Sequence, residues 1–364
     1  MFKTKLLTGL VAGSLLISVV GCGTSAAPNS SSNSQSPAQQ QAVSLTGAGS
    51  TFVQPLIMQQ IAEYAKTNPN VTINYQGVGS GAGIKQISDQ TLDFGATDAF
   101  MTDSQLAGAK GGKILQIPLT LGAEAISYNL PGNPQNLKIT PEVLTNIYLG
   151  KITKWNDPAI TAENPGVSLP NLAITVAHRS DGSGTTSIFT HYLSAISPTW
   201  KSQVGAGTSV NWPVGVGGKG NASVAGIVQQ TSGAIGYIEL AYALQNNLPH
   251  ALIKNQAGKW VGPSLESASA AAAAFQVPDD MRVNIVNAPG ATAYPIAGFS
   301  WALIYQQQTD QAKATAMLNF LDYCIHDGQK LAPAMQYAPL PSNLASREEA
   351  MLKTVTYQGQ PILK

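Results

Sequence analysis

Arg179 and the turn that follows it are the residues best suited to binding an anion. The segment 177–187 reads AHRSDGSGTTS and stands between a β-branched apolar run and a run with helical apolar spacing. The first N–H groups of a helix lack partners within it, and the helix dipole adds positive charge there. Ser183 and Thr185 can donate hydroxyl hydrogen bonds, and Arg179 can offer paired N–H groups to an oxyanion. In the alternative interpretation, Asp181 or Ser183 only caps the helix.

Similar residues stand at three other predicted strand ends. Gly-Ser-Gly occurs at 79–81 and again at 182–184, Gly-Ser-Thr occurs at 49–51, and Asp98 ends a short apolar run. Parallel α/β sheets bind ligands beyond the carboxyl ends of their strands, so we expect these turns to form one anion site. Two alternatives stay open, in which Asp98 caps its own turn and Arg179 forms a surface ion pair.

Alternating strand and helix patterns must position these turns, and they predict a mostly parallel α/β sheet. The strands 114–120 and 123–128 are predicted to meet near 121–122. The other predicted strands are 43–49, 71–75, 92–98, 172–177, 233–238, 282–286 and 299–305. One predicted helix follows the turn at 49–51 and ends at 68–69, and a second follows the turn at 79–81. Further helices are predicted at 141–149, 187–193, 222–230, 264–275, 312–326 and 346–354.

The charge of the chain excludes one broad class of partner. Charged residues make up 11% of the 364 residues, against about 25% in typical domains. Without Lys3 and Lys5, which lie in a predicted leader, 18 basic residues face 19 acidic ones. A nucleic-acid-binding protein would show a basic face, so we expect no nucleic-acid partner. An anion must instead be held by local dipoles and one or two charges.

The N-terminus has the pattern of an export signal. Lys3 and Lys5 precede an apolar run at 6–20, which is short for a membrane span but suits a signal peptide. The run ends at Val-Val-Gly-Cys, which resembles a bacterial lipobox with Cys22 as the lipidated residue. The alternative is an ordinary signal cleaved near 26–27. Residues 25–41 are nearly all Ser, Asn, Gln, Ala and Pro, which predicts a flexible tether. Cys324 would then be the one remaining cysteine, a small core residue.

Six motifs, in matching order from about residue 44 onward, resemble the phosphate-binding protein of the bacterial high-affinity phosphate ABC importer. They are GAGSTF at 47–52, YQGVGSG at 75–81, DFGATD at 93–98, RSDGSGT at 179–185, GGKGN at 217–221 and GAIGY at 233–237. The resemblance implies a type II periplasmic-binding-protein fold, with two α/β lobes, a two-strand hinge and phosphate in the cleft. No run of His, Cys, Asp and Glu has metal-ligand spacing, so we expect no metal, and we expect no cofactor and no catalytic residue.

Carried over motif by motif, the resemblance implies which residues contact phosphate. Asp181 would pair with the arginine and orient it, and His178 stands where some relatives have a second basic residue. The implied contacts are Ser50, Thr51, Phe52 through its backbone N–H, Ser80, Asp98, Arg179, Ser183, Gly184 and Thr185.

Asp98 gives this site a chemical reason to prefer phosphate. Phosphate near neutral pH keeps at least one proton, whereas sulfate has none. The Asp98 carboxylate can accept a hydrogen bond from a phosphate O–H but would face sulfate unpaired. Leaving a buried acceptor unmatched costs roughly 1–3 kcal/mol, and more when it is charged.

We expect the signal peptide at 1–21, the lipidated cysteine and tether at 22–42, the first lobe at 43–121 plus 292–364, and the second at 122–291.

Two other functions are alternatives to phosphate capture. A hydrolase using Ser183 would need a nucleophile elbow, but the turn lacks the G-x-S-x-G spacing and the four histidines are scattered. We therefore expect no enzyme. The other rival is the same fold binding sulfate, molybdate or an organic phosphate. The expected partners are inorganic phosphate, the membrane permease subunits of the importer and, through the lipid anchor, the outer face of the membrane. We expect a monomer.

Overall fold

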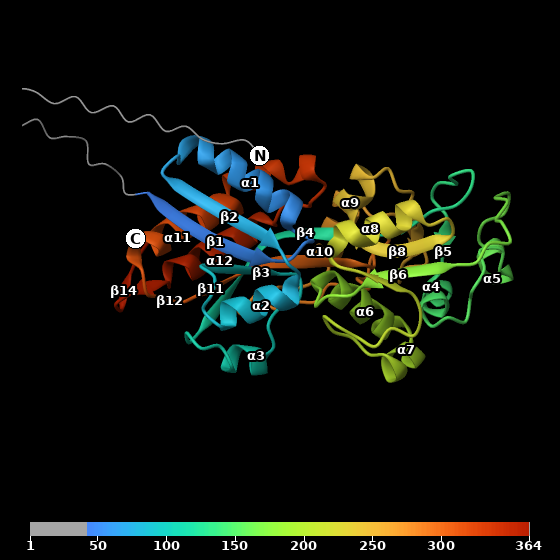
Figure 1. Cartoon of the computed structure of the whole chain (residues 1–364), viewed down its shortest axis with the longest axis horizontal. Helices are drawn as coiled ribbons and strands as arrows, with labels where there is room; N and C mark the ends of the chain where they lie inside the picture. The colour runs from blue at the N-terminus through green and yellow to red at the C-terminus, as the bar shows by residue number, and fades with distance from the viewer. Residues whose placement is uncertain (1–41, 364) are drawn as a thin grey trace, which may run out of the picture. The chain divides into compact units, whose positions relative to one another are not determined.

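An eight-stranded mixed sheet organises the computed structural model, which describes residues 42–363 (Figure 1). The predicted signal peptide, Cys22 and nearly all of the predicted tether lie outside these residues. The strand order is β2-β1-β3-β11-β4-β8-β6-β7. The strands of this sheet are β1 (Val43–Gly49), β2 (Val71–Gly77), β3 (Phe94–Thr97), β4 (Ile114–Tyr128), β6 (Thr175–Arg179), β7 (Val216–Gly218), β8 (Ala234–Glu239) and β11 (Ala297–Tyr305).

Two parallel half-sheets flank a central antiparallel pair. β1 pairs parallel with β2 and β3, and β6 pairs parallel with β7 and β8. β4 and β11 run antiparallel to each other and to the strands beside them. The predicted parallel sheet is therefore right within each half and wrong at the centre. We call β2-β1-β3 with its helices the first lobe, and β8-β6-β7 with its helices the second lobe.

β4 corrects the prediction of two strands that meet near 121–122. It is one strand of 15 residues, every one of them buried. It pairs with β11 up to Ala123 and with β8 from Glu124 onward, so it belongs to both halves. The strand runs unbroken through Gly122, where a Cβ would stand only 2.8 Å from the Phe52 ring. Pro118 cannot donate to the ladder, and the register of the β4–β11 pair shifts next to it.

The predicted strand at 282–286 is also wrong, since these residues form no strand. Met281 has a φ of 60°, outside the β region. The Arg282 N–H donates to Asp280 and the Val286 N–H donates to Asn284. These local side-chain bonds take the place of a strand ladder.

Helices follow the strands closely, as the alternating pattern predicts. Asn68 is the C-cap of α1, and Thr140 caps α4 by accepting from the Val143 N–H at 3.1 Å. The helices are α1 (Gln54–Thr67), α2 (Ser80–Ser88), α3 (Asp103–Ala107), α4 (Pro141–Tyr148), α5 (Pro158–Thr161), α6 (Gly184–Ile196), α7 (Pro198–Gln203), α8 (Gly220–Gln230), α9 (Leu240–Gln245), α10 (Leu265–Ala273), α11 (Gln311–Ile325), η1 (Asp327–Leu331), η2 (Pro333–Met335) and α12 (Ser342–Lys353).

Two small sheets complete the described fold. One has the order β10-β9-β5 and the other β12-β13-β14. Their strands are β5 (Lys138–Ile139), β9 (Leu252–Lys254), β10 (Trp260–Val261), β12 (Gln307–Gln308), β13 (Thr356–Tyr357) and β14 (Gln360–Pro361). Within residues 42–363 no helix combines the length and the apolarity that crossing a membrane requires.

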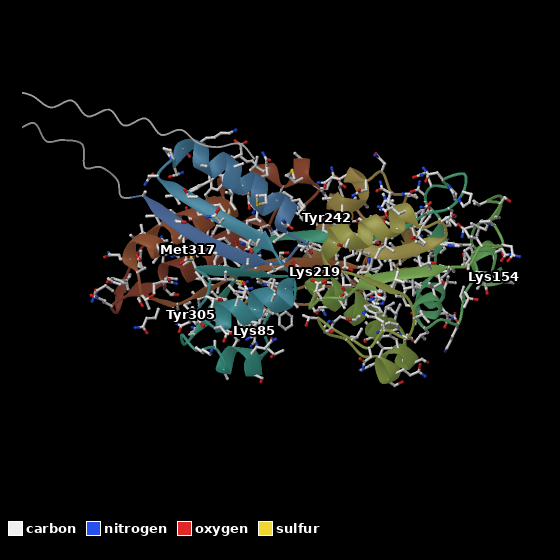
Figure 2. All side chains as sticks on the ribbon, viewed as in Figure 1. Lys85, Lys154, Lys219, Tyr242, Tyr305 and Met317 are labelled. Carbon is white, nitrogen blue, oxygen red and sulfur yellow. The ribbon has the colours of Figure 1, made fainter. Side chains whose placement is uncertain are left out.

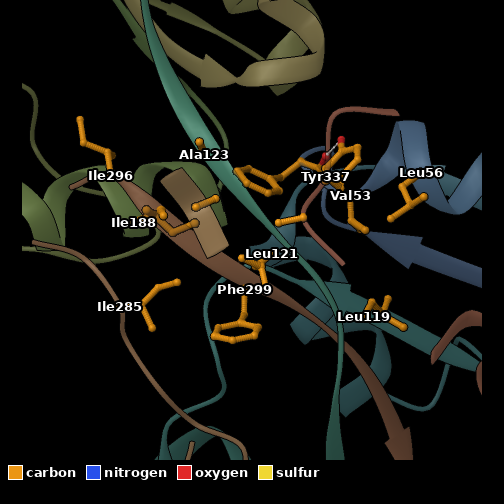
Figure 3. Packing of buried hydrophobic residues seen from close by; sticks show 14 of the residues in the cluster. Val53, Leu56, Leu119, Leu121, Ala123, Ile188, Ile285, Ile296, Phe299 and Tyr337 are labelled. Carbon is orange, nitrogen blue, oxygen red and sulfur yellow. Dashed lines mark hydrogen bonds between the residues drawn. The ribbon is translucent and has the colours of Figure 1, made fainter. Parts of the chain in front are cut away.

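The largest hydrophobic core is continuous between the lobes through β4 and β11 (Figure 3). Leu121 and Phe299, paired across these strands, are almost completely buried. Each such side chain contributes about 1.5–3 kcal/mol of burial free energy. Cys324 is buried in α11, which confirms its prediction as a core residue. The shared core fixes the strand ends of both lobes close to the same central pair. The residue boundaries of the lobes stay a prediction.

Candidate functional site

Asp98 follows β3 and its carboxylate lies among three serine hydroxyls. Oδ1 accepts from Ser50 at 2.5 Å and from Ser300 at 2.6 Å, and Oδ2 accepts from Ser80 at 3.2 Å. The residue is 4% exposed. A carboxylate offers about four lone-pair positions, two on each oxygen. Oδ1 is therefore filled, and Oδ2 keeps one position for a further donor.

Burial changes the acidity of this carboxyl. It raises the pKa of Asp98 to about 6, while the hydrogen bonds from Ser300 and Ser50 and the nearby charge of Arg179 oppose the rise. Asp98 is consequently ionised at pH 7 and above, and becomes a proton donor as the pH falls below about 6. Protonation of this one residue changes which ligands the site can match.

Arg179 ends β6 and is held by Asp181 in a two-pronged ion pair. Its Nε donates to Asp181 Oδ1 at 2.8 Å and its Nη2 donates to Oδ2 at 2.6 Å. Nη1 donates to Thr185 Oγ1 at 3.2 Å. Burial alone would raise the pKa of Asp181, but its bonds with Arg179 lower it overall. Of the five guanidinium N–H groups, two have no acceptor among the described residues and can serve a ligand.

The N-terminus of α6 faces Asp98 directly. Ser183 caps this helix, since its Oγ accepts from the Thr186 N–H at 3.0 Å. The cap named in the alternative interpretation is therefore present, and it leaves the Ser183 proton unused. A Cβ on Gly184 would stand 2.5 Å from Asp98 Oδ2 and 2.6 Å from Ser80 Oγ. The first N–H groups of α6, those of Gly184 and Thr185, have no acceptor within the helix. They add partial positive charge where the carboxylate keeps its free position.

The two lobes contact each other around this point. The Gly81 N–H of the first lobe donates to the Gly182 carbonyl of the second at 2.9 Å. Asn221, at the start of α8, donates to Thr51 Oγ1 through its backbone N–H at 3.2 Å and through Nδ2 at 3.0 Å. The Tyr242 hydroxyl donates to the Thr51 carbonyl at 2.7 Å, and Figure 2 shows Tyr242 near the junction of the half-sheets.

The structure brings the residues singled out from the sequence together, with the two lobes facing each other. Ser50 and Phe52 already form hydrogen bonds within the protein. The Ser50 Oγ donates to Asp98 and accepts the N–H groups of Phe52 at 2.9 Å and Val53 at 3.2 Å. The Ser80 hydroxyl donates to Asp98 and accepts the Asp98 N–H at 3.1 Å. These residues hold Asp98 in place, and their direct contact with a ligand stays a prediction.

Sequence reasoning missed two residues of the site. Ser300 lies in the middle of β11, away from any turn, so no local pattern marks it. Asn221 closes the GGKGN motif, but the motif alone assigns it no contact.

His178 supplies no second positive charge to the ligand side. Its ring stacks on Trp212 at 4.8 Å, its Nδ1 donates to the Arg179 carbonyl, and burial lowers its pKa.

A cavity of about 320 Å³ adjoins the site and reaches Asp98. It lies between α2 and α6, where Ser187, His191 and Phe299 contribute to its lining. Asp98 is almost completely buried, yet it contributes to the lining of this partly open cavity. Of the residues singled out from the sequence, Asp98 alone lines this cavity, whose lining is mostly apolar; the donors of Arg179 and of the α6 N-terminus lie outside it.

Comparison with known proteins gives the family. A model of the PBP superfamily domain matches residues 32–327. The phosphate-binding protein PstS of Xylella fastidiosa (strain Temecula1) is 47% identical over 315 residues, which cover 86% of this chain and 85% of that protein. The PstS of Pasteurella multocida is 43% identical and covers 86% of this chain and 91% of its own length. The PstS of Methanocaldococcus jannaschii is 38% identical over 358 residues.

Solved structures agree on the fold. A high-affinity periplasmic phosphate-binding protein (PfluDING) bound with phosphate has a TM-score of 0.68 and 22% identity, over 84% of this chain and 93% of its own. A phosphate ABC transporter substrate-binding protein from Clostridium perfringens, described as putative and holding phosphate, has a TM-score of 0.61 and 18% identity, over 82% of this chain and 100% of its own. The superfamily domain spans most of the sequence, and the PstS relatives match over most of their length. The chain therefore belongs to the PstS phosphate-binding protein family of the PBP superfamily.

Proposed function

We propose that this chain captures inorganic phosphate between its lobes and delivers it to an ABC importer. The observation that carries the proposal is the buried Asp98 carboxylate, which keeps one free acceptor position beside the arginine and helix N-terminus of the other lobe. A site of donors alone would take any tetrahedral oxyanion. One acceptor among donors requires a guest that brings a proton.

The free donors fit the oxygens of such a guest. Arg179 has two N–H groups left, and the N-terminus of α6 offers the N–H groups of Gly184 and Thr185. The hydroxyls of Thr51 and Thr185 each accept two hydrogen bonds, so each keeps its proton for a ligand. Hydrogen phosphate has a single O–H, which can donate to Asp98, and three other oxygens, which can accept from all of these donors at once.

The residue assignments follow from this arrangement. Asp98 accepts the phosphate O–H, and Arg179, Thr51, Gly184 and Thr185 donate to the other oxygens. Direct contacts by Ser50, Phe52 and Ser80 require their present bonds to rearrange when phosphate enters. The Ser183 hydroxyl accepts the Thr186 N–H and keeps its own proton for a ligand. Asp181 holds Arg179 in its orientation.

Capture is expected to be coupled to closure of the lobes, since contacts to both lobes favour the state that unites them. The chain boundaries of the lobes are those given above, at 121–122 and 291–292. A chain anchored through Cys22 at the outer face of the membrane could exchange phosphate with the permease subunits without diffusing away. We assign no catalytic role: the relatives are binding proteins, and the Ser183 hydroxyl is the cap of α6.

Titration calorimetry with a panel of oxyanions tests this function. The protein is expected to bind phosphate with a dissociation constant at least about 1,000-fold below that for sulfate or molybdate at pH 8. Equal affinity for sulfate would remove the proposed selectivity. Serine-dependent turnover of p-nitrophenyl phosphate, abolished in Ser183→Ala, would instead establish the hydrolase alternative.

A further inference from the structure

Asn221 is a buried polar residue whose side chain lies between the two lobes. It is 0% exposed and is the second residue of α8. Its Nδ2 donates to Thr51 Oγ1 of the first lobe at 3.0 Å and to Thr185 Oγ1 of the second lobe at 3.1 Å. Both threonines are proposed phosphate contacts, and one amide group therefore connects them across the cleft.

The orientation of this amide is fixed by a backbone group. Asn221 Oδ1 accepts the N–H of Glu239, the last residue of β8, at 3.1 Å. Turning the amide over would place Nδ2 against that N–H and leave two donors facing each other. The carbonyl side must therefore face Glu239, and the NH2 side must face the two threonines.

The contacts of Asn221 determine what the threonine hydroxyls can do. Thr51 Oγ1 accepts from the backbone N–H and Nδ2 of Asn221, which fills both of its lone pairs. Thr185 Oγ1 accepts from Arg179 Nη1 and from Asn221 Nδ2, which fills both of its lone pairs as well. Each hydroxyl retains only its own proton and can act only as a donor toward the cleft.

We propose that Asn221 is a positioning residue for anion binding, which commits the hydroxyls of Thr51 and Thr185 to donate and links the lobes while they do so. The inference rests on the proposed function, since it concerns the same site. It assigns a role to the GGKGN motif, which the ligand contacts inferred from the sequence leave unused. Asn221 does not itself contact the ligand in this account.

Asn221→Asp and Asn221→Ala separate this role from simple packing. The first variant keeps the size of the side chain but replaces the two-proton donor with an acceptor, which the threonine hydroxyls would then serve. The introduced carboxylate would also stand near Asp98, Asp181 and Glu239, with Arg179 as the nearby positive group. Asn70→Asp, at a half-buried position before β2 and outside the site, is the matched control for the added charge.

Phosphate, sulfate and molybdate affinities are measured by calorimetry between pH 5 and pH 8, together with thermal unfolding of the unliganded proteins. At pH 8 the expected loss of phosphate affinity is about 100-fold or more for Asn221→Asp and about 10-fold for Asn221→Ala, because a hydrogen bond to a charged group is worth about tenfold to a hundredfold. The loss in Asn221→Asp should shrink as the pH falls, since the protonated acid recovers a donor. Asn70→Asp should bind as the unmodified chain does.

The possible outcomes are distinct. If Asn221→Asp bound at least as well as Asn221→Ala, or if its loss stayed constant with pH, the residue would be a space-filling part of the core and the inference would be wrong. If the unmodified chain preferred sulfate or molybdate and Asn221→Asp lost that ligand, the positioning role would hold while the proposed phosphate function failed. Binding of none of the three anions by the unmodified chain would overturn both.

Discussion

Gly184→Ala adds a single methyl group at the point where the second lobe meets Asp98. The new Cβ would stand 2.5 Å from Asp98 Oδ2, 2.6 Å from Asp98 Cβ and 2.6 Å from Ser80 Oγ. Non-bonded carbon and oxygen atoms need roughly 3.4 Å, so the N-terminus of α6 and Asp98 must separate by about 1 Å. Gly184 lacks a positive φ, so the backbone itself accepts alanine. The penalty falls on the arrangement in which the lobes touch.

The size of the effect follows from the cost of overpacking. Relieving such a clash costs about 1–3 kcal/mol, which corresponds to roughly 5- to 150-fold in affinity when only the closed state carries it. The affected donors are the amides of α6, which must approach a phosphate oxygen closely. We therefore expect a phosphate dissociation constant 10- to 100-fold higher, with the unliganded protein as stable as before.

Titration calorimetry and thermal unfolding measure the two effects separately. Gly226→Ala is the matched control, because Gly226 lies within α8 and nothing stands within 4 Å of its Cβ position. This control should leave phosphate affinity unchanged and raise stability by about 0.5–1 kcal/mol. Unchanged phosphate affinity in Gly184→Ala would show that the contact of α6 with Asp98 is not part of the binding-competent state.

Three further predictions concern single charges. Arg179→Ala should weaken phosphate binding at least about 100-fold by removing the cationic fork, and near-normal calorimetric affinity would exclude Arg179 from the site. Sulfate affinity of the unmodified chain should rise about tenfold per unit as the pH falls from 8 to 6, then level off below the Asp98 pKa of about 6, because the protonated acid can donate; a pH-independent sulfate titration would contradict this. Burial raises the pKa of Glu348 to about 8, against the opposing charge of Arg347, and neither carboxyl oxygen has a hydrogen-bond partner among the described residues. The stability that comes from its retained proton is full below about pH 4.5 and is lost as the pH rises through about 8. The free energy of unfolding of Glu348→Gln, relative to that of the unmodified chain, should therefore increase by roughly 2–4 kcal/mol between pH 5 and pH 9. Denaturant titrations measure this difference, and a difference that did not change with pH would refute the prediction.

The site could be predicted from the sequence where its residues belong to local turns. Ser183 and Gly184 start a helix within a few residues of Arg179, so cap chemistry and the free amides follow from residue type alone. The apolar run before Asp98 likewise predicts this residue at the end of a short strand, and the structure places it directly after β3. Such local signals depend on the next few residues and survive tertiary packing.

The rest of the site depends on contacts between distant segments. Ser300 reaches Asp98 only because β11 lies between β3 and β4 in the sheet. The amide of Asn221 in α8 is oriented by the N–H of Glu239, at the end of β8. The ring of Phe52 likewise leaves no room for a side chain at Gly122 of β4. None of these contacts leaves a periodicity or a spacing in the sequence.

Asp98→Asn tests the central claim most directly, because it keeps the shape of the side chain and removes the charge that sulfate cannot match. The quantity to measure is the ratio of phosphate to sulfate affinity at pH 8, by calorimetry on the unmodified chain and on the variant. We predict that the ratio falls at least about 100-fold, with much of the change coming from stronger sulfate binding. A ratio that stayed the same in the variant would show that Asp98 does not select the guest by its proton.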